Sequence, residues 1–174
     1  MTDTWLDAFT PECSMWHHNK IASTSNQPVH PDIEKIMPTK EGAQAKLEIQ
    51  QWTGYEVTPL HCLGTVAKEL KVANIYLKDE SPRFGLGSFK ALGGAYAVFK
   101  VLSHLIKEQT GIEKINSADL RNGTYASICK NITVVTATDG NHGKSVAWGA
   151  RELVCHCKMY IHREVRNGRE QAIA

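Results

Sequence analysis

Lys90 is the residue of this chain best placed to act as a reactive amine. It follows the segment Gly85-Leu86-Gly87-Ser88-Phe89 and opens the small-residue run Ala91-Leu92-Gly93-Gly94-Ala95. Glycine lets the backbone turn sharply and come close to a bulky ligand, which a solvated lysine would not need. The glycine spacing fits neither a P-loop nor a kinase glycine loop. The pattern therefore favours an amine held against a cofactor. A solvated Lys90, with Gly93 and Gly94 serving only close helix packing, remains the alternative.

A second polar turn, Thr138-Asp139-Gly140-Asn141-His142-Gly143, carries the remaining candidates for chemistry. The Asp139 carboxylate has the chemistry of a general base, although aspartate also commonly stabilises turns and caps helices. Backbone N–H groups at the start of the following helix are suited to bind a carboxylate. His142 is as compatible with a structural role as with ligand contact.

Both turns are predicted to follow strands and to precede helices. Periodicity and turn signals predict strands at 75–79, 132–137 and 155–161, and helices at 38–52, 63–70, 144–153 and from Lys90 to at least Ile106. Residues 1–37 are expected to be irregular, and 111–130 to form a polar connection. The β-branched 132–137 strand is typical of one buried in a parallel sheet. Alternating strands and helices predict an α/β fold with a parallel sheet flanked by helices, where ligands bind beyond the carboxyl ends of strands.

Composition excludes several classes of protein. The 174 residues carry a net charge of +2, with 42% hydrophobic and 22% charged residues, which gives no field suggesting nucleic acid. No apolar stretch reaches membrane-spanning length, and the acidic start lacks the order of a signal peptide. The five cysteines lack framework spacing, so reduced thiols and a cytoplasmic location are expected. Cys155 and Cys157 would share one face of a strand that leaves His156 on the other, so no metal site is expected.

The two turns together resemble the fold-type II (tryptophan synthase beta-like) family of pyridoxal-phosphate enzymes, and more finely its diaminopropionate ammonia-lyase branch. The segments that carry the resemblance are Lys78-Asp79-Glu80-Ser81, Arg83-Phe84-Gly85-Leu86, Phe89-Lys90, Leu92-Gly93-Gly94-Ala95-Tyr96 and Thr138 to Gly143. Serine and threonine dehydratases usually carry serine where this chain has Asp139. The resemblance runs from about Tyr55 to the end of the sequence.

The resemblance implies a role for each matching residue. Lys90 would carry pyridoxal phosphate as a Schiff base, for which its pKa must fall through desolvation or a nearby cation, and Phe89 could supply an apolar wall. Asp139 is the candidate base for one substrate enantiomer, with Lys90 as its rival. Asn141 resembles the residue that hydrogen-bonds the 3′-oxygen of the cofactor. Gly140 and His142 are expected to contact the substrate.

The resemblance also implies what this chain does and lacks. Members of the family are more than twice as long, so residues 38–174 are expected to be a partial enzyme domain without the phosphate loop. The implied reaction is α,β-elimination of the small amino acid 2,3-diaminopropionate to pyruvate and ammonia, in a family that is commonly homodimeric. The alternatives are a truncated, noncatalytic fragment or partner-binding remnant, and a lyase like the serine/threonine dehydratases.

Overall fold

The computed structural model describes residues 28, 30–138 and 140–163 of a chain that divides into two units, Met1–Pro38 and Thr39–Ala174. In the first unit, helix α1 spans Pro31–Ile36. The Nδ1 atom of His30 accepts a hydrogen bond from the Asp32 N–H at 3.3 Å and caps the helix. Irregular backbone was expected over 1–37, and this helix departs from it because proline is well suited to a first helical turn. The assignment of domains itself stays a prediction.

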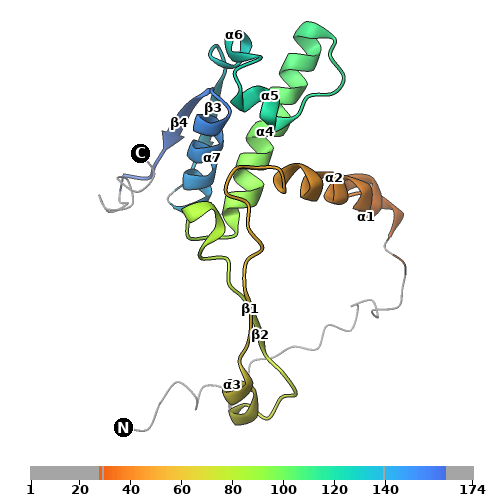
Figure 1. Ribbon diagram of the computed structural model, residues 1–174, viewed down its shortest axis with the longest axis vertical. Coiled ribbons are helices and arrows are strands. Elements are labelled where there is room, and N and C mark those ends of the chain that lie inside the picture. Colours follow the sequence, from red (N-terminus) through yellow and green to blue (C-terminus); the bar gives the residue numbers. More distant parts are fainter. Residues whose placement is uncertain (1–27, 29, 139, 164–174) are drawn as a thin grey trace. The chain divides into compact units, whose positions relative to one another are not determined.

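The second unit alternates helices with short strands (Figure 1). Its helices are α2 (Thr39–Ile49), α3 (Gly64–Glu69), α4 (Lys90–Thr110), α5 (Ser117–Arg121), α6 (Ala126–Cys129) and α7 (Asn141–Glu152). Its described residues form the strands β1 (Leu60–Cys62), β2 (Tyr76–Lys78), β3 (Thr133–Ala137) and β4 (His156–Tyr160), and a 3-10 turn at Arg83–Gly85. The predicted strands and main helices are therefore confirmed, whereas α5 and α6 lie in what was expected to be a polar connection and were not predicted.

The four strands form two separate pairs. Strands β3 and β4 are parallel, with Thr133 opposite His156, as predicted for a β-α-β unit. Strands β1 and β2 are antiparallel, with Leu60 opposite Lys78. The segment before Lys90 therefore follows a strand of an antiparallel pair and not a strand of the parallel sheet. Periodicity identifies a strand but not its partner, which is why the sequence did not distinguish these two arrangements.

The core of the second unit lies between α4, α7 and the parallel pair. Leu102 and Ile106 of α4 are fully buried, one helical turn apart. The buried apolar cluster consists of Val98, Phe99, Leu102, Ile106, Leu120, Cys129, Val146 and Leu153. Figure 1 shows α4 and α7 side by side, with β3 and β4 next to α7. The long helix is therefore held by contacts that come from much later in the sequence.

Strand β3 alternates between half-buried and exposed residues. Val134 packs against the core, whereas Val135 on the opposite face is 58% exposed. The strand predicted to be buried in a parallel sheet is therefore in a parallel pair but, among the described residues, only half-buried on the one face that packs against the core. In the part of the chain that the structure describes, no helix combines the length and the apolar character needed to cross a membrane.

Candidate functional site

The turn before Lys90 has the backbone conformation that its glycines suggested. Gly85 and Gly87 have φ angles of +70° and +74°, in the left-handed region that glycine adopts without strain. Lys90 is the first residue of α4, and its N–H donates to the Ser88 Oγ at 3.2 Å. The side chain of Lys90 is exposed. The turn therefore presents an accessible amine at the beginning of a long helix.

Phe89, the residue before Lys90, is largely exposed. Its side chain is 63% exposed, and it occupies the N-cap position of α4. The apolar wall expected from Phe89 stays a prediction. Desolvation of Lys90 would have to come from a bound ligand or from further protein surface.

Helices α4 and α7 touch at two glycines. A Cβ atom on Gly94 would lie 2.8 Å from the Ser145 Cβ, and one on Gly149 would lie 2.7 Å from the Ala95 Cα. The Ser145 hydroxyl accepts a hydrogen bond from the Ala95 N–H at 3.0 Å and donates one to the Ala91 carbonyl at 3.1 Å. These two groups pair with each other in a regular helix, so Ser145 ties α7 directly to the first turns of α4.

These contacts show that α4 and α7 run in the same direction. Ser145 meets Ala91 and Gly149 meets Ala95, so the partners in both pairs are 54 residues apart. The same register places Lys90, the first residue of α4, level with the first turn of α7. Packing therefore brings the beginnings of both helices, with Lys90 on one and Asn141 on the other, to the same end of the helix pair.

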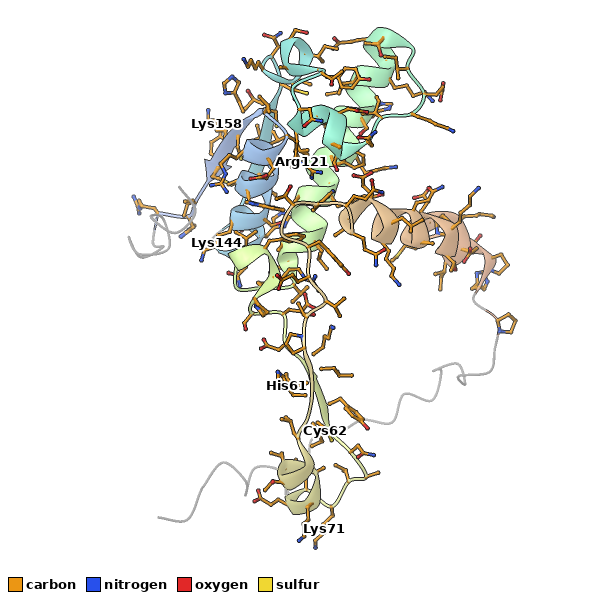
Figure 2. All side chains as sticks on the ribbon, in the orientation of Figure 1. His61, Cys62, Lys71, Arg121, Lys144 and Lys158 are labelled. Carbon is orange, nitrogen blue, oxygen red and sulfur yellow. The ribbon has the colours of Figure 1, made fainter. Side chains whose placement is uncertain are left out.

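The beginning of α7 has the features of an anion site. Gly140 is its N-cap and offers no side-chain cap, while Asn141 and His142 lie exposed in its first turn. The helix begins three residues earlier than the predicted Lys144, which Figure 2 labels on α7. Uncapped N–H groups and the positive end of a 12-residue helix favour a carboxylate or phosphate. Asp139, the predicted base, lies outside the described residues.

His142 also lines a groove between α4 and β3. The groove has a volume of about 440 Å³ and is otherwise largely apolar. Its lining includes Gly94, Val98, Val134 and Val146. His142 therefore lies where the helix start meets this groove, a position compatible with either of the roles considered for it.

These residues fall within a recognised family. The family model described as "Pyridoxal-phosphate dependent enzyme" matches residues 52–174. The chain belongs to this pyridoxal-phosphate-dependent family. Membership confirms the expected fold-type II class and the expected cofactor of the family, and its matched region contains both turns.

Curated relatives within the family point to one branch. The chain is 45% identical to the diaminopropionate ammonia-lyase of Salmonella typhimurium over 107 residues, which is 62% of this chain and 26% of the relative. It is 35% identical to that of Escherichia coli strain K12 over 154 residues, or 88% of this chain and 37% of the relative. The chain therefore spans about a third of the length of the relatives it matches.

A solved structure agrees with this branch. The holo form of the Escherichia coli diaminopropionate ammonia-lyase matches with a TM-score of 0.64 and 36% identity. The match covers 77% of this chain and 33% of the other. The resemblance to the diaminopropionate ammonia-lyase branch, stated from two turns and their flanking segments, is thus confirmed at the level of sequence and fold.

The residues at the shared end of α4 and α7 fit pyridoxal phosphate chemically. The Lys90 amine is exposed, and α7 offers an uncapped helix start for an anionic group. A Cβ atom on Gly87 or Gly140 would meet no atom within 4 Å, so the backbone is open to a ligand at both turns. Among the described residues this end therefore leaves space for the family cofactor.

Ser145 and Arg83 have no role that the sequence alone predicts, yet both are buried polar residues in the structure. Arg83 pairs with Glu80 at a distance of 2.8 Å. The opposite charges at i and i+3 were a visible signal for that pair, since such spacing favours contact on one turn. Nothing local could have identified Ser145, because its partners lie about 50 residues away in the sequence.

Proposed function

We propose that this chain supplies the lysine-bearing part of the active site of a pyridoxal-phosphate-dependent ammonia-lyase that acts on 2,3-diaminopropionate. The observation that carries the proposal is the parallel packing of α4 and α7, which brings Lys90 and Asn141 to one end of the helix pair. The names of the matched relatives support the substrate. The overall reaction consumes one water and releases pyruvate and two ammonia molecules.

Each candidate residue has a proposed task. Lys90 holds the cofactor covalently through its amine, and Asn141 donates a hydrogen bond to the cofactor's 3′-oxygen. The N–H groups that follow Gly140 bind the substrate carboxylate, which the positive end of α7 favours. His142 contacts the substrate beside them. Phe89 borders the cofactor, and its exposed ring is available to become covered when the ligand binds.

Proton transfer is proposed to depend on Asp139, with Lys90 as the alternative. When bound, pyridoxal phosphate supplies an electron sink that makes the substrate's α-proton acidic enough for a side chain to remove. A carboxylate on the turn before α7 would sit close to the substrate carboxylate's binding site. The role of Asp139 rests on its position in the sequence between Thr138 and Gly140.

The setting of this reaction is part of the proposal. We expect the protein to act in the cytoplasm, which is supported by four free cysteines among the described residues, Cys62, Cys129, Cys155 and Cys157. We also expect it to assemble as a homodimer, as members of the family commonly do. Sedimentation of the purified protein, with and without cofactor, would measure that assembly.

Covalent trapping of the cofactor tests the proposal. The purified chain is mixed with pyridoxal phosphate, the absorption band of the lysine-bound cofactor is recorded, and borohydride fixes the bond for peptide mapping. We expect the band and the label on Lys90, with loss of both in Lys90→Ala. Lys158→Ala is the matched control, because Lys158 lies on β4 with its ammonium 5.1 Å from the Tyr160 ring (Figure 2).

Turnover assays separate the alternative functions. Pyruvate release is measured from both enantiomers of 2,3-diaminopropionate, and from serine and threonine. Faster turnover of serine or threonine would reassign the chain to the dehydratases. A folded chain that takes no label on Lys90 would instead support the alternative of a noncatalytic fragment.

A further inference from the structure

The segment that leads to Lys90 is fastened by a buried arginine. The Arg83 side chain is 7% exposed, and its guanidinium forms a two-pronged pair with Glu80. The Nε atom donates to the Glu80 Oε2 at 2.8 Å, and the Nη2 atom donates to the Glu80 Oε1 at 2.9 Å. This planar fork is a geometry that arginine can make and lysine cannot.

The same guanidinium also holds a second stretch of chain. Its Nη1 atom donates to the Glu56 carbonyl at 2.7 Å, and its Nη2 atom donates to the Thr58 hydroxyl oxygen at 3.1 Å. The Thr58 hydroxyl in turn donates to Glu80, and the guanidinium carbon lies 5.5 Å from the centroid of the Tyr55 ring. Arg83 therefore binds the segment 55–58 to the segment 80–83, which are more than twenty residues apart.

The charges in this group support one another. Hydrogen bonding to Arg83 is the main cause that lowers the pKa of Glu80, and hydrogen bonding to Glu80 is the main cause that raises the pKa of Arg83. The Lys78 ammonium adds a hydrogen bond to the Thr58 carbonyl at 2.6 Å. We call the set Thr58, Glu80 and Arg83 the arginine clamp.

Phe84, the residue after Arg83, holds the backbone that leads from the arginine clamp into the turn 85–89. Its φ angle of +50° lies in the left-handed region, which costs a non-glycine residue free energy. Its ring stacks on Trp148 of α7 at a centroid distance of 4.8 Å and lies 5.9 Å from Trp52. The ring therefore keeps the strained backbone in place and attaches it to the helix that carries Asn141.

Between Phe84 and Ala91 the chain has little burial of its own. Gly85, Gly87 and Phe89 are exposed, and a Cβ atom on either glycine would meet no atom within 4 Å. At the far end Ala91 is buried and bonded through its carbonyl to Ser145. The turn 85–89 is thus attached at its C-terminal end through Ala91 and Ser145, and at its N-terminal end through the arginine clamp and the stacking of Phe84 on Trp148.

We infer that Arg83 is a positioning residue for Lys90, because the arginine clamp joins the N-terminal end of the turn 85–89 to the segment 55–58, alongside the stacking of Phe84 on Trp148. This inference rests on the proposed function, since it assumes that Lys90 must meet a cofactor. Without the clamp the turn keeps its attachments to α4 and α7 but loses its link to the segment 55–58, so the Lys90 amine samples more positions. The cofactor then finds the reactive arrangement less often.

Hydrogen–deuterium exchange of the full chain tests the clamp without any cofactor. In Arg83→Lys the charge remains but the fork is lost, and we expect amide exchange from 85 to 90 to rise about tenfold or more. Exchange in β3 and in α7 from 145 to 152 should stay as in the wild type. Arg151→Lys is the matched control, because the Arg151 side chain is 75% exposed, and it should change neither region.

Cofactor labelling tests whether Arg83 positions Lys90 or only stabilises the fold. A purely stabilising role would leave the ratio of label on Lys90 to label on Lys158 unchanged. Borohydride-trapped pyridoxal phosphate is quantified on Lys90 and on Lys158 of the same molecules. We expect the ratio of Lys90 to Lys158 label to fall about tenfold in Arg83→Lys and in Arg83→Met. The ratio should keep its wild-type value in Arg151→Lys.

The outcomes separate the clamp from the proposed function. Unchanged exchange at 85–90 would overturn the inference, and so would a uniform rise that includes α7, since Arg83 would then be a general stabiliser. A rise at 85–90 with an unchanged labelling ratio would also overturn it. If the wild type shows no preference for Lys90, the proposed function fails, and the exchange result alone then decides whether the clamp fixes the turn.

Discussion

The contact between Gly149 and Ala95 provides the sharpest test of how α4 and α7 pack. In Gly149→Ala the new Cβ would lie 2.7 Å from the Ala95 Cα and 2.9 Å from the Ala95 Cβ. Carbon atoms prefer a separation of about 3.5–4.0 Å, so one helix must move away from the other. The obstructing Cα belongs to the backbone of α4 and has no rotamer with which to escape.

The magnitude follows from two opposing effects. Overpacking a close contact costs about 1–3 kcal/mol, and a backbone obstacle places this site near the upper end. Replacing glycine by alanine inside a helix returns about 1 kcal/mol. We therefore expect Gly149→Ala to lower the free energy of unfolding by about 2 kcal/mol.

Gly93→Ala on α4 is the matched control. Its Cβ atom would meet no atom within 4 Å, so only the helix-propensity gain of about 1 kcal/mol applies. Urea unfolding followed by circular dichroism measures both variants, and the two should differ by about 3 kcal/mol in opposite directions. Equal effects of the two substitutions would refute the α4–α7 register on which the candidate site is built.

Three further outcomes are expected. Hydrogen bonding to Arg83 holds the pKa of Glu80 in the folded protein below its ordinary 4.5. The charged carboxylate therefore stabilises the fold fully above pH 4.5, and this stabilisation is lost as the pH falls through the lowered pKa of the folded protein. In urea titrations Glu80→Gln should therefore cost about 1–3 kcal/mol at pH 7 and less at pH 3, and an equal cost at both would contradict the ion pair. Burial raises the pKa of Cys155 to about 11. At pH 8 iodoacetamide should therefore modify Cys155 at least about tenfold more slowly than the exposed Cys62, which peptide mapping would measure. Equal rates of modification would argue against the burial of Cys155. Gly87→Ala should cost about 1–2 kcal/mol in urea unfolding because its φ is +74°, and a stabilised variant would mean that the turn is not left-handed there.

Much of the candidate site could be predicted from the sequence because its signals are local. Glycines before Lys90 predicted a tight turn, and two of them adopt positive φ angles. Periodicity after Lys90 predicted a helix reaching at least Ile106, which the structure confirms as Lys90–Thr110. The flanking segments also predicted the family, since long strings of matching residues carry that information without any knowledge of the fold.

Local signals failed where short elements or partners were concerned. Helices α5 and α6 have only five and four residues, too few for a helical period to stand out. Phe89 is 63% exposed, and an apolar residue type does not by itself say whether anything covers the side chain. Strand β2 was predicted at its correct place, yet its antiparallel partner β1 could not be identified from alternation.

The sequence by itself determined which residues can do chemistry, where the helices and strands lie, and the family to which the chain belongs. Only the tertiary structure decided that α4 and α7 run in parallel with Ser145 between Ala91 and Ala95, and that Arg83 joins Glu80 to Thr58. The physical reason is separation along the chain. A turn or a helix face is set by neighbouring residues, whereas these contacts join positions some 20 to 50 residues apart and form only when the core packs.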